Sequence, residues 1–164
     1  MVNKSIIGAV CACLAVVSFS ANAALVERLG GLAYYDTEAN LTWLADANYA
    51  QTSGYDADGL MIWVNANSWA AGLNVAGATG WRLPDAGTCF GYNCADSEMS
   101  NLFYNVLGGN AGDPISTTHN ANYDLFSNLQ PETYWSAMEV AGTTCCAGMF
   151  MFDGGYQSTL NKST

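Results

Sequence analysis

The chain has 164 residues, 51% of them hydrophobic, and carries 14 acidic side chains against only four basic ones. Its formal net charge of −10 repels phosphate backbones and anionic membrane surfaces, so the composition argues against nucleic acid as a partner. A divalent cation, or a neutral polar ligand such as a sugar, suits this charge better.

The N-terminus has the three parts of a secretory signal peptide, which we place at residues 1–23. Lys4 supplies a short basic region, residues 6–19 form an uncharged apolar run, and Ser20-Ala-Asn-Ala23 ends in a small-x-small cleavage pattern. A permanent membrane anchor needs about 20 apolar residues, so a retained anchor is the weaker alternative. We expect export from a Gram-negative-type bacterium, a secreted or cell-surface location, and no stable membrane insertion.

Residues 24–164 are long enough for one domain with one core, and they open with a predicted β-hairpin. Without Lys4 this part has three cations against 14 acids, a formal charge of −11. In "GLAYYDTEANLTWLAD" we expect strands at Leu32 to Asp36 and Leu41 to Asp46, joined by a turn at 37–40.

The polar stretch "NYAQTSGYDADG" is a predicted loop with candidate ligand-binding residues. Tyr49 and Tyr55 offer a flat apolar face and a hydroxyl, which suits a saccharide ring. Asp56 and Asp58 fit positions three and five of an EF-hand, but the first ligand and the final glutamate of that motif are absent. The remaining hypothesis is a looser calcium site at Asp56 and Asp58; the alternative is a solvated acidic turn.

Apolar residues recur with helical spacing in two segments, 66–73 and 99–106, which predicts two helices. Ser97 is a good N-cap for the second helix.

Between the helices, "GWRLPD" places Arg82, one of the few cations, in an apolar setting. We expect Arg82 to bond a carboxylate or backbone carbonyls and to hold the fold together. Three further residues are assigned to the structural framework: Trp81, Pro84 and Trp135.

Four cysteines follow the predicted cleavage site, and an even count in an exported chain suggests disulfides. Cys89–Cys94 is the favoured pair because its loop "CFGYNC" is rich in turn residues, although either cysteine can also pair with the later two. Cys145 and Cys146 are adjacent, with Cα atoms only about 3.8 Å apart, so a bridge between them is disfavoured. They are predicted to be free thiols or to bridge another chain. Zinc is disfavoured, because paired C-x-x-C units are missing and the chain has one histidine.

Catalysis is not expected. The histidine, His119, lies in a long polar loop at 110–128 that has no nucleophile elbow. Carboxylates near strand ends provide candidates for a glycosidase pair, but nothing in the sequence places two of them at the required separation. These carboxylates are Asp36, Asp46, Glu132 and Glu139.

The tripeptide Gln130-Pro131-Glu132 can present two side-chain oxygens to one cation, and it can equally end a loop before a strand. "TYWSAMEV" and "AGMFMFDG" then read as short strands separated by a turn near Gly142. The order of strands, helices and strands predicts an α+β fold with two helices on a mostly antiparallel sheet and long loops.

Six segments occur in an order that resembles the Lcl C-terminal domain family of secreted bacterial proteins: "LTWLADANYA", "GYDADG", "SWAAGL", "GWRLPD", "SEMSNLFYNVLG" and "YWSAME". The resemblance covers most of residues 24–156 and implies a C-type-lectin-like, extracellular interaction domain. The best-described member type of this family is an adhesin for sulfated glycans, and one subgroup carries a PEP-CTERM tail. Relatives close with a strand similar to A-W-A-V-R-P-G, whereas this chain ends in "STLNKST", so it is either truncated or lacks its last strand.

The sequence therefore predicts a non-catalytic binding or adhesion module for an extracellular glycan or protein. Loops 49–58 and 113–132 are expected to present aromatic and acidic groups to a neutral ligand. Two alternatives stay open: an enzyme on the related formylglycine-generating scaffold, and a structural component of an extracellular matrix. The candidate ligand-binding residues are Tyr49, Tyr55, Asp56, Asp58, Gln130 and Glu132.

Overall fold

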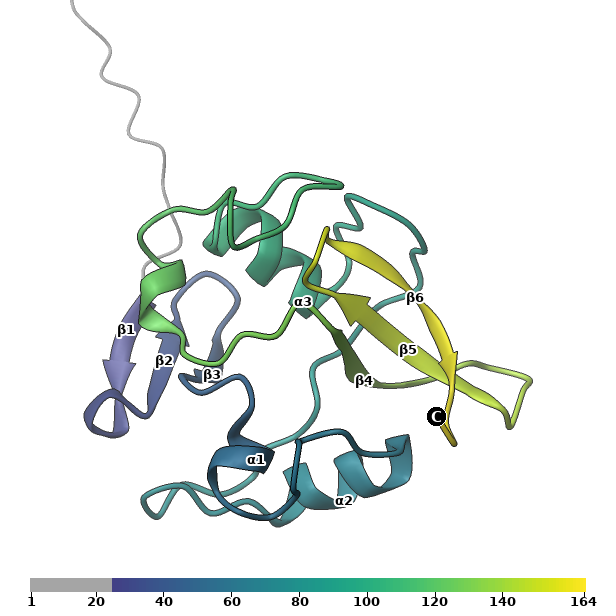
Figure 1. Ribbon diagram of the computed structural model, residues 1–164, viewed down its shortest axis with the longest axis horizontal. Coiled ribbons are helices and arrows are strands. Elements are labelled where there is room, and N and C mark those ends of the chain that lie inside the picture. Colours follow the sequence, from purple (N-terminus) through teal and green to yellow (C-terminus); the bar gives the residue numbers. More distant parts are fainter. Residues whose placement is uncertain (1–24) are drawn as a thin grey trace, which may run out of the picture.

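The computed structural model describes residues 25–164, and the predicted signal peptide lies outside this range. These residues form an α+β structure with two three-stranded antiparallel sheets, in the orders β1-β2-β3 and β4-β5-β6 (Figure 1). The α+β class is as predicted, but the strands are divided between two sheets. None of the helices within residues 25–164 has the length and apolar character needed to cross a membrane.

The first sheet contains the predicted hairpin and one additional strand. β2 (Ala33–Asp36) pairs with β3 (Leu41–Leu44), and the carboxylate of Asp36 accepts backbone N–H groups in the turn between them. β1 (Leu25–Arg28) pairs with the other edge of β2 and is linked to it by a single 3₁₀ turn, η1 (Leu29–Gly31). β1 was not predicted, because three of its four side chains are exposed and the segment has no clear apolar alternation.

Both predicted helices are present. α2 (Trp63–Gly72) buries Ala66 and Ala70, and α3 (Glu98–Asn101) continues as a π-helical turn, η2 (Leu102–Val106). Ser97 caps α3, since its hydroxyl oxygen accepts a backbone N–H at 3.2 Å. Two further helical turns occur in predicted loops: α1 (Tyr49–Thr52) and η3 (Tyr123–Leu125).

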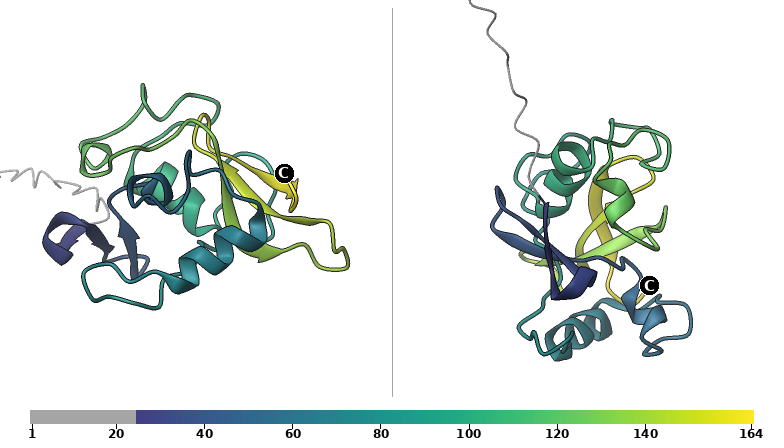
Figure 2. Two further views of the ribbon diagram at one scale, coloured as in Figure 1. Left: turned by 60° about the horizontal axis from the view of Figure 1, so that its bottom comes forward. Right: turned by 90° about the vertical axis from the view of Figure 1, so that its left-hand side faces the viewer.

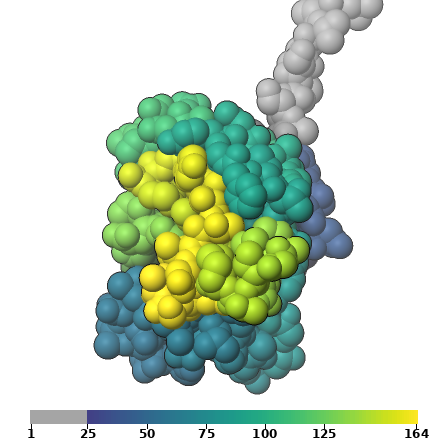
Figure 3. Space-filling view, turned by 90° about the vertical axis from the view of Figure 1, so that its right-hand side faces the viewer, coloured from purple at the N-terminus to yellow at the C-terminus, as the bar shows by residue number. Residues whose placement is uncertain are grey.

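The second sheet contains the two predicted strands, β4 (Thr133–Glu139) and β5 (Cys146–Met151). A third strand, β6 (Tyr156–Asn161), pairs with β5 along its whole length. Figure 3 shows β6 beside the β4–β5 hairpin on one face of the molecule. β6 was missed because "YQSTLN" is mostly polar, as is usual for a strand at a sheet edge.

The core lies between α3–η2 and the second sheet. Phe103 and Phe150 are fully buried there, and Phe152 is nearly so. Trp43 of the first sheet packs against the edge of this cluster. The two sheets lie on opposite sides of the molecule, with α3 and α2 on the two remaining sides (Figures 1 and 2).

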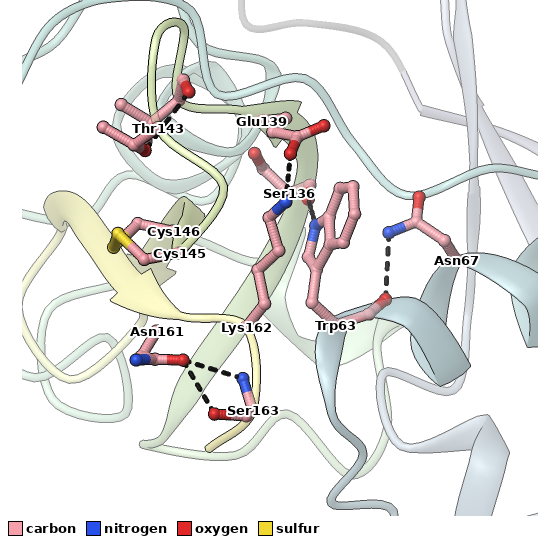
Figure 4. Close-up of polar contacts among 11 residues, drawn as sticks. Trp63, Asn67, Ser136, Glu139, Thr143, Cys145, Cys146, Asn161, Lys162 and Ser163 are labelled. Atoms are coloured by element: carbon pink, nitrogen blue, oxygen red, sulfur yellow. Dashed lines mark hydrogen bonds and ion pairs between the residues drawn. A yellow bond between two sulfur atoms is a disulfide. The ribbon is translucent and has the colours of Figure 1, made fainter.

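A second group of contacts ties α2 to the end of β6 (Figure 4). The ring nitrogen of Trp63 donates to the backbone carbonyl of Ser136 at 2.8 Å, and the Trp63 backbone N–H donates to the carbonyl of Lys162 at 3.0 Å. The Lys162 ammonium lies over the Trp63 ring, 4.7 Å from its centroid, and pairs with Glu139. These contacts join α2, β4 and β6 at one point.

Residues 25–164 contain two disulfides. Cys89, whose pairing with Cys94 the sequence favours, is bonded to Cys94 with a Cα–Cα distance of 5.5 Å. Cys145 and Cys146 are bonded to each other, which corrects the prediction that they are free thiols or bridge another chain. They lie where the turn between β4 and β5 ends, at a bend of the backbone.

Candidate functional site: a tryptophan-lined cavity

A cavity of about 1050 Å³ lies between the first sheet, α2, the segment 78–84 and the start of β4. Its wall is largely apolar and aromatic, which is the usual character of small-ligand sites. Four of the five tryptophans of the chain contribute to this wall: Trp43, Trp69, Trp81 and Trp135.

Each tryptophan comes from a different part of the chain, and local structure explains its position. Trp69 lies on the face of α2 that also carries the buried Ala66 and Ala70. The indole N–H of Trp135, on β4, donates to the carbonyl of Met61 at 2.8 Å, which fixes its ring against the start of α2. That of Trp81 donates to the carbonyl of Ala78 at 3.0 Å. Both residues were predicted to be structural, and both also line the cavity.

The segment just before the first of the two expected ligand-binding loops is joined to the second loop by hydrogen bonds. One carboxylate oxygen of Asp46 accepts the backbone N–H of Asn48 at 2.9 Å and the side-chain amide of Asn128 at 3.1 Å. The backbone N–H of Ala47 donates to the carbonyl of Ser127 at 2.9 Å. These bonds place the loop after β3 beside the loop before β4, at the edge of the cavity.

The predicted ligand-binding residues divide into two groups. Tyr55 is 60% exposed and packs outside the cavity against Trp69, with ring centroids 6.3 Å apart. Asp56 also lies outside the wall. The other four line the cavity together: Tyr49, Asp58, Gln130 and Glu132.

The proposed calcium ligands are engaged in a turn. The carboxylate of Asp56 accepts the backbone N–H groups of Asp58 and Gly59, and these bonds lower the pKa of Asp56. Asp58 in turn accepts the N–H of Leu60 at 2.9 Å. Residues 25–164 contain no group of three histidine, cysteine, aspartate or glutamate side chains close enough to hold a metal ion. A calcium site here would therefore need backbone carbonyls and water to complete it.

Arg82 is bonded to Glu98, a partner that the sequence did not identify. Its guanidinium donates to both oxygens of the Glu98 carboxylate and to the carbonyl of Leu83. Burial raises the pKa of Glu98, but hydrogen bonds from Arg82 and from the backbone N–H of Asp85 outweigh it, and the pKa lies below its usual value. Although both side chains border the cavity, their charges neutralise each other there.

The carboxylates considered for catalysis do not gather at one place. Asp46 and Glu132 line the cavity, whereas Glu139 pairs with Lys162 at the far end of β4 and Asp36 closes the turn of the first sheet. His119 stacks on Tyr123, with ring centroids 4.2 Å apart.

Sequence reasoning missed Trp43 as a site residue and did not select Tyr134 as one. The ring nitrogen of Trp43 is buried and has no hydrogen-bond partner among the described residues. The hydroxyl oxygen of Tyr134 accepts the backbone N–H of Gln130 at 2.7 Å, and burial raises the pKa of Tyr134 to about 12. The local signal for both was only an aromatic residue within a strand, which is also the signal of an ordinary core residue.

Comparison with known proteins found no matching family model, no matching curated protein and no matching solved structure.

Proposed function

We propose that the protein is an extracellular, non-catalytic binding module, and that its cavity takes part of a neutral glycan. The observation that carries this proposal is the convergence of four tryptophans on one cavity. Beside them, Gln130 and Glu132 supply polar groups from the loop before β4. The ordered sequence motifs similar to the Lcl C-terminal domain family, with its C-type-lectin-like fold, support the same kind of function.

The chemistry of the wall suits a sugar. Indole and phenol rings stack on the apolar C–H faces of a pyranose, and amide and carboxylate oxygens accept hydrogen bonds from its hydroxyl groups. Trp69 and Tyr49 offer such rings, and Asp58 and Glu132 of the same cavity wall offer acceptor oxygens.

The charge favours a neutral ligand. Residues 24–164 have a formal charge of −11, and Asp46, Asp58 and Glu132 all border the cavity. Arg82, one of the two arginines at its edge, is committed to Glu98. A sulfated glycan, the ligand type implied by the family resemblance, would meet net repulsion here.

A glycan array with and without calcium tests the proposal on the purified protein. We expect binding to neutral glycans without turnover, and a loss of about tenfold or more in affinity for Trp69→Ala. Tyr92→Ala is the matched control, because Tyr92 is 50% exposed and packs against Tyr156 away from the cavity. Failure to bind any neutral glycan, or hydrolysis of the bound sugar, would overturn the proposal.

A further inference from the structure

The Cys89–Cys94 bridge lies in a loop that other contacts also hold in place. Gly91 exchanges two backbone hydrogen bonds with Gln157, at 2.8 and 2.9 Å. The side-chain amide of Gln157 donates to the carbonyl of Cys89 at 2.7 Å. Cys94 is only 2% exposed. The fold therefore keeps these two cysteines together and shields one of them, so it favours the bonded form.

The Cys145–Cys146 bridge has a different setting. Cys145 is exposed and Cys146 is half-buried, where the exposed turn 141–144 enters β5. A bridge between chain neighbours closes a small ring around a single peptide bond, so it constrains the unfolded chain little and adds little to the fold. Because folding and reduction are linked, such a bridge gains little protection from the fold. Exposed disulfides of this kind are the ones that thiols reduce most readily.

The backbone carbonyls of this pair hold neighbouring chain segments. The carbonyl of Cys146 accepts the backbone N–H of Val140 at 3.1 Å, and that of Cys145 accepts the backbone N–H of Lys162 at 2.8 Å. Lys162 directly follows β6, and its own carbonyl accepts the backbone N–H of Trp63, the first residue of α2, at 3.0 Å (Figure 4). Two successive backbone hydrogen bonds thus connect the disulfide to α2.

The same junction borders the cavity, because Leu160 near the end of β6 and Trp69 on α2 both line it. The closed ring restricts the peptide between the two cysteines, which keeps the carbonyl of Cys145 directed at Lys162. Opening the ring removes this covalent restriction. The carbonyl is then free to turn, and the hydrogen bond to Lys162 is weakened.

From these contacts we infer that Cys145–Cys146 is a redox-active site, which a dithiol reductant opens while the other disulfide stays intact. Its opening loosens the attachment of Lys162 to α2. The inference does not depend on the proposed glycan-binding function.

The exchange uses two thiols of the reductant. The first, as a thiolate, attacks the sulfur of Cys145, which forms a mixed disulfide and releases Cys146 as a thiolate. The second attacks the reductant's sulfur in that mixed disulfide, which closes the reductant's own disulfide and releases Cys145. Two electrons pass from the reductant to the protein, and the two protons lost by its thiols complete the two cysteine thiols.

Stepwise reduction of the purified, oxidised protein tests the selectivity. The folded protein is equilibrated with increasing ratios of reduced to oxidised dithiothreitol, free thiols are alkylated with iodoacetamide, and mass spectrometry locates the label. We expect Cys145 and Cys146 to be half-reduced at a ratio at least about tenfold lower than Cys89 and Cys94. Equal midpoints, or the opposite order, would overturn the inference.

Hydrogen exchange followed by NMR, before and after this selective reduction, tests the effect on the junction. We expect the amide hydrogens of Lys162 and Trp63 to exchange at least about threefold faster in the reduced form, because local opening there becomes easier. The amide hydrogens of β2, in the other sheet, should be unaffected. Unchanged exchange at Lys162 and Trp63 would overturn the inference.

Two double variants identify the disulfide that is responsible. Cys145→Ser/Cys146→Ser should show the faster Lys162 exchange without any reductant, and reductant should change it no further. Cys89→Ser/Cys94→Ser is the matched control, in which the Lys162 amide should still respond to reductant as in the wild type. A response of Cys145→Ser/Cys146→Ser as large as that of the wild type would overturn the inference.

Discussion

Arg82 and Glu98 face each other edge to edge, with Nη1 2.8 Å from Oε2 and Nη2 2.6 Å from Oε1. The same Oε2 accepts the backbone N–H of Asp85 at 2.7 Å. Because Glu98 is the first residue of α3, this arrangement fastens the segment after α2 to the beginning of α3. Arg82 thus stabilises the wall of the cavity and is not available to clamp an anion.

Arg82→Ala is expected to lower the free energy of unfolding by about 1–2 kcal/mol, measured by urea denaturation. Loss of a fully buried pair would cost roughly 3 kcal/mol or more, but the Arg82 side chain is 52% exposed and Glu98 retains the Asp85 N–H. Arg82→Lys should recover only part of the loss, since an ammonium cannot make the two-pronged contact. Arg28→Ala, a change on the edge strand β1, serves as the control. An Arg82→Ala protein as stable as the wild type would show that the pair contributes nothing.

The same pair predicts a dependence of stability on pH. The pKa of Glu98 is lower in the folded protein than in the unfolded chain, so its contribution is complete above the unfolded pKa, about 4.3. It is lost as the pH falls through the lower, folded pKa. The difference in unfolding free energy between wild type and Arg82→Ala should therefore be largest near neutral pH and shrink as the pH falls below the unfolded pKa. A difference that grows on acidification would contradict this assignment.

The sequence predicted those parts of the fold whose pattern is local. Apolar spacing identified α2 and α3, and alternation identified the β2–β3 hairpin and the strands β4 and β5. The edge strands β1 and β6 were not predicted from the sequence. A strand that pairs on one side only and faces solvent on the other needs no continuous apolar pattern.

The site was less predictable, since it depends on segments distant in the chain. Nothing local to Trp43 or Trp135 indicates that they share a cavity, and their roles follow only from the packing of the two sheets. The disulfide between the neighbouring residues Cys145 and Cys146 was not predicted, for a different reason. The usual Cα separation of bonded cysteines argues against Cys145–Cys146, yet the two are bonded with their Cα atoms 3.8 Å apart.

The two disulfides are expected to differ in their effect on stability. Cys89–Cys94 closes a loop with a sequence separation of five, and replacing both cysteines with serine should cost about 2 kcal/mol on loop-entropy grounds. Cys145 and Cys146 are already covalent neighbours, so their bridge constrains the unfolded chain less, and the Cys145→Ser/Cys146→Ser protein should lose less. Calorimetric melting of both double variants measures the difference. The opposite order would mean that the adjacent disulfide stabilises the folded state directly.

Gly148 of β5 should tolerate no side chain. A Cβ there would lie 2.6 Å from the hydroxyl oxygen of Ser136, a fully buried residue on β4, and 3.0 Å from the Cβ of Ala86. We expect Gly148→Ala to lower the free energy of unfolding by about 1–3 kcal/mol, because the second sheet must shift to accept the methyl.

The matched control is Gly72→Ala in α2, where a Cβ meets no atom within 4 Å. It should raise stability by up to about 1 kcal/mol, because alanine restricts the unfolded chain and favours the helix. Denaturant unfolding of the two variants side by side checks the opposite signs, and a Gly148→Ala protein as stable as Gly72→Ala would contradict the close packing of β5 against Ser136.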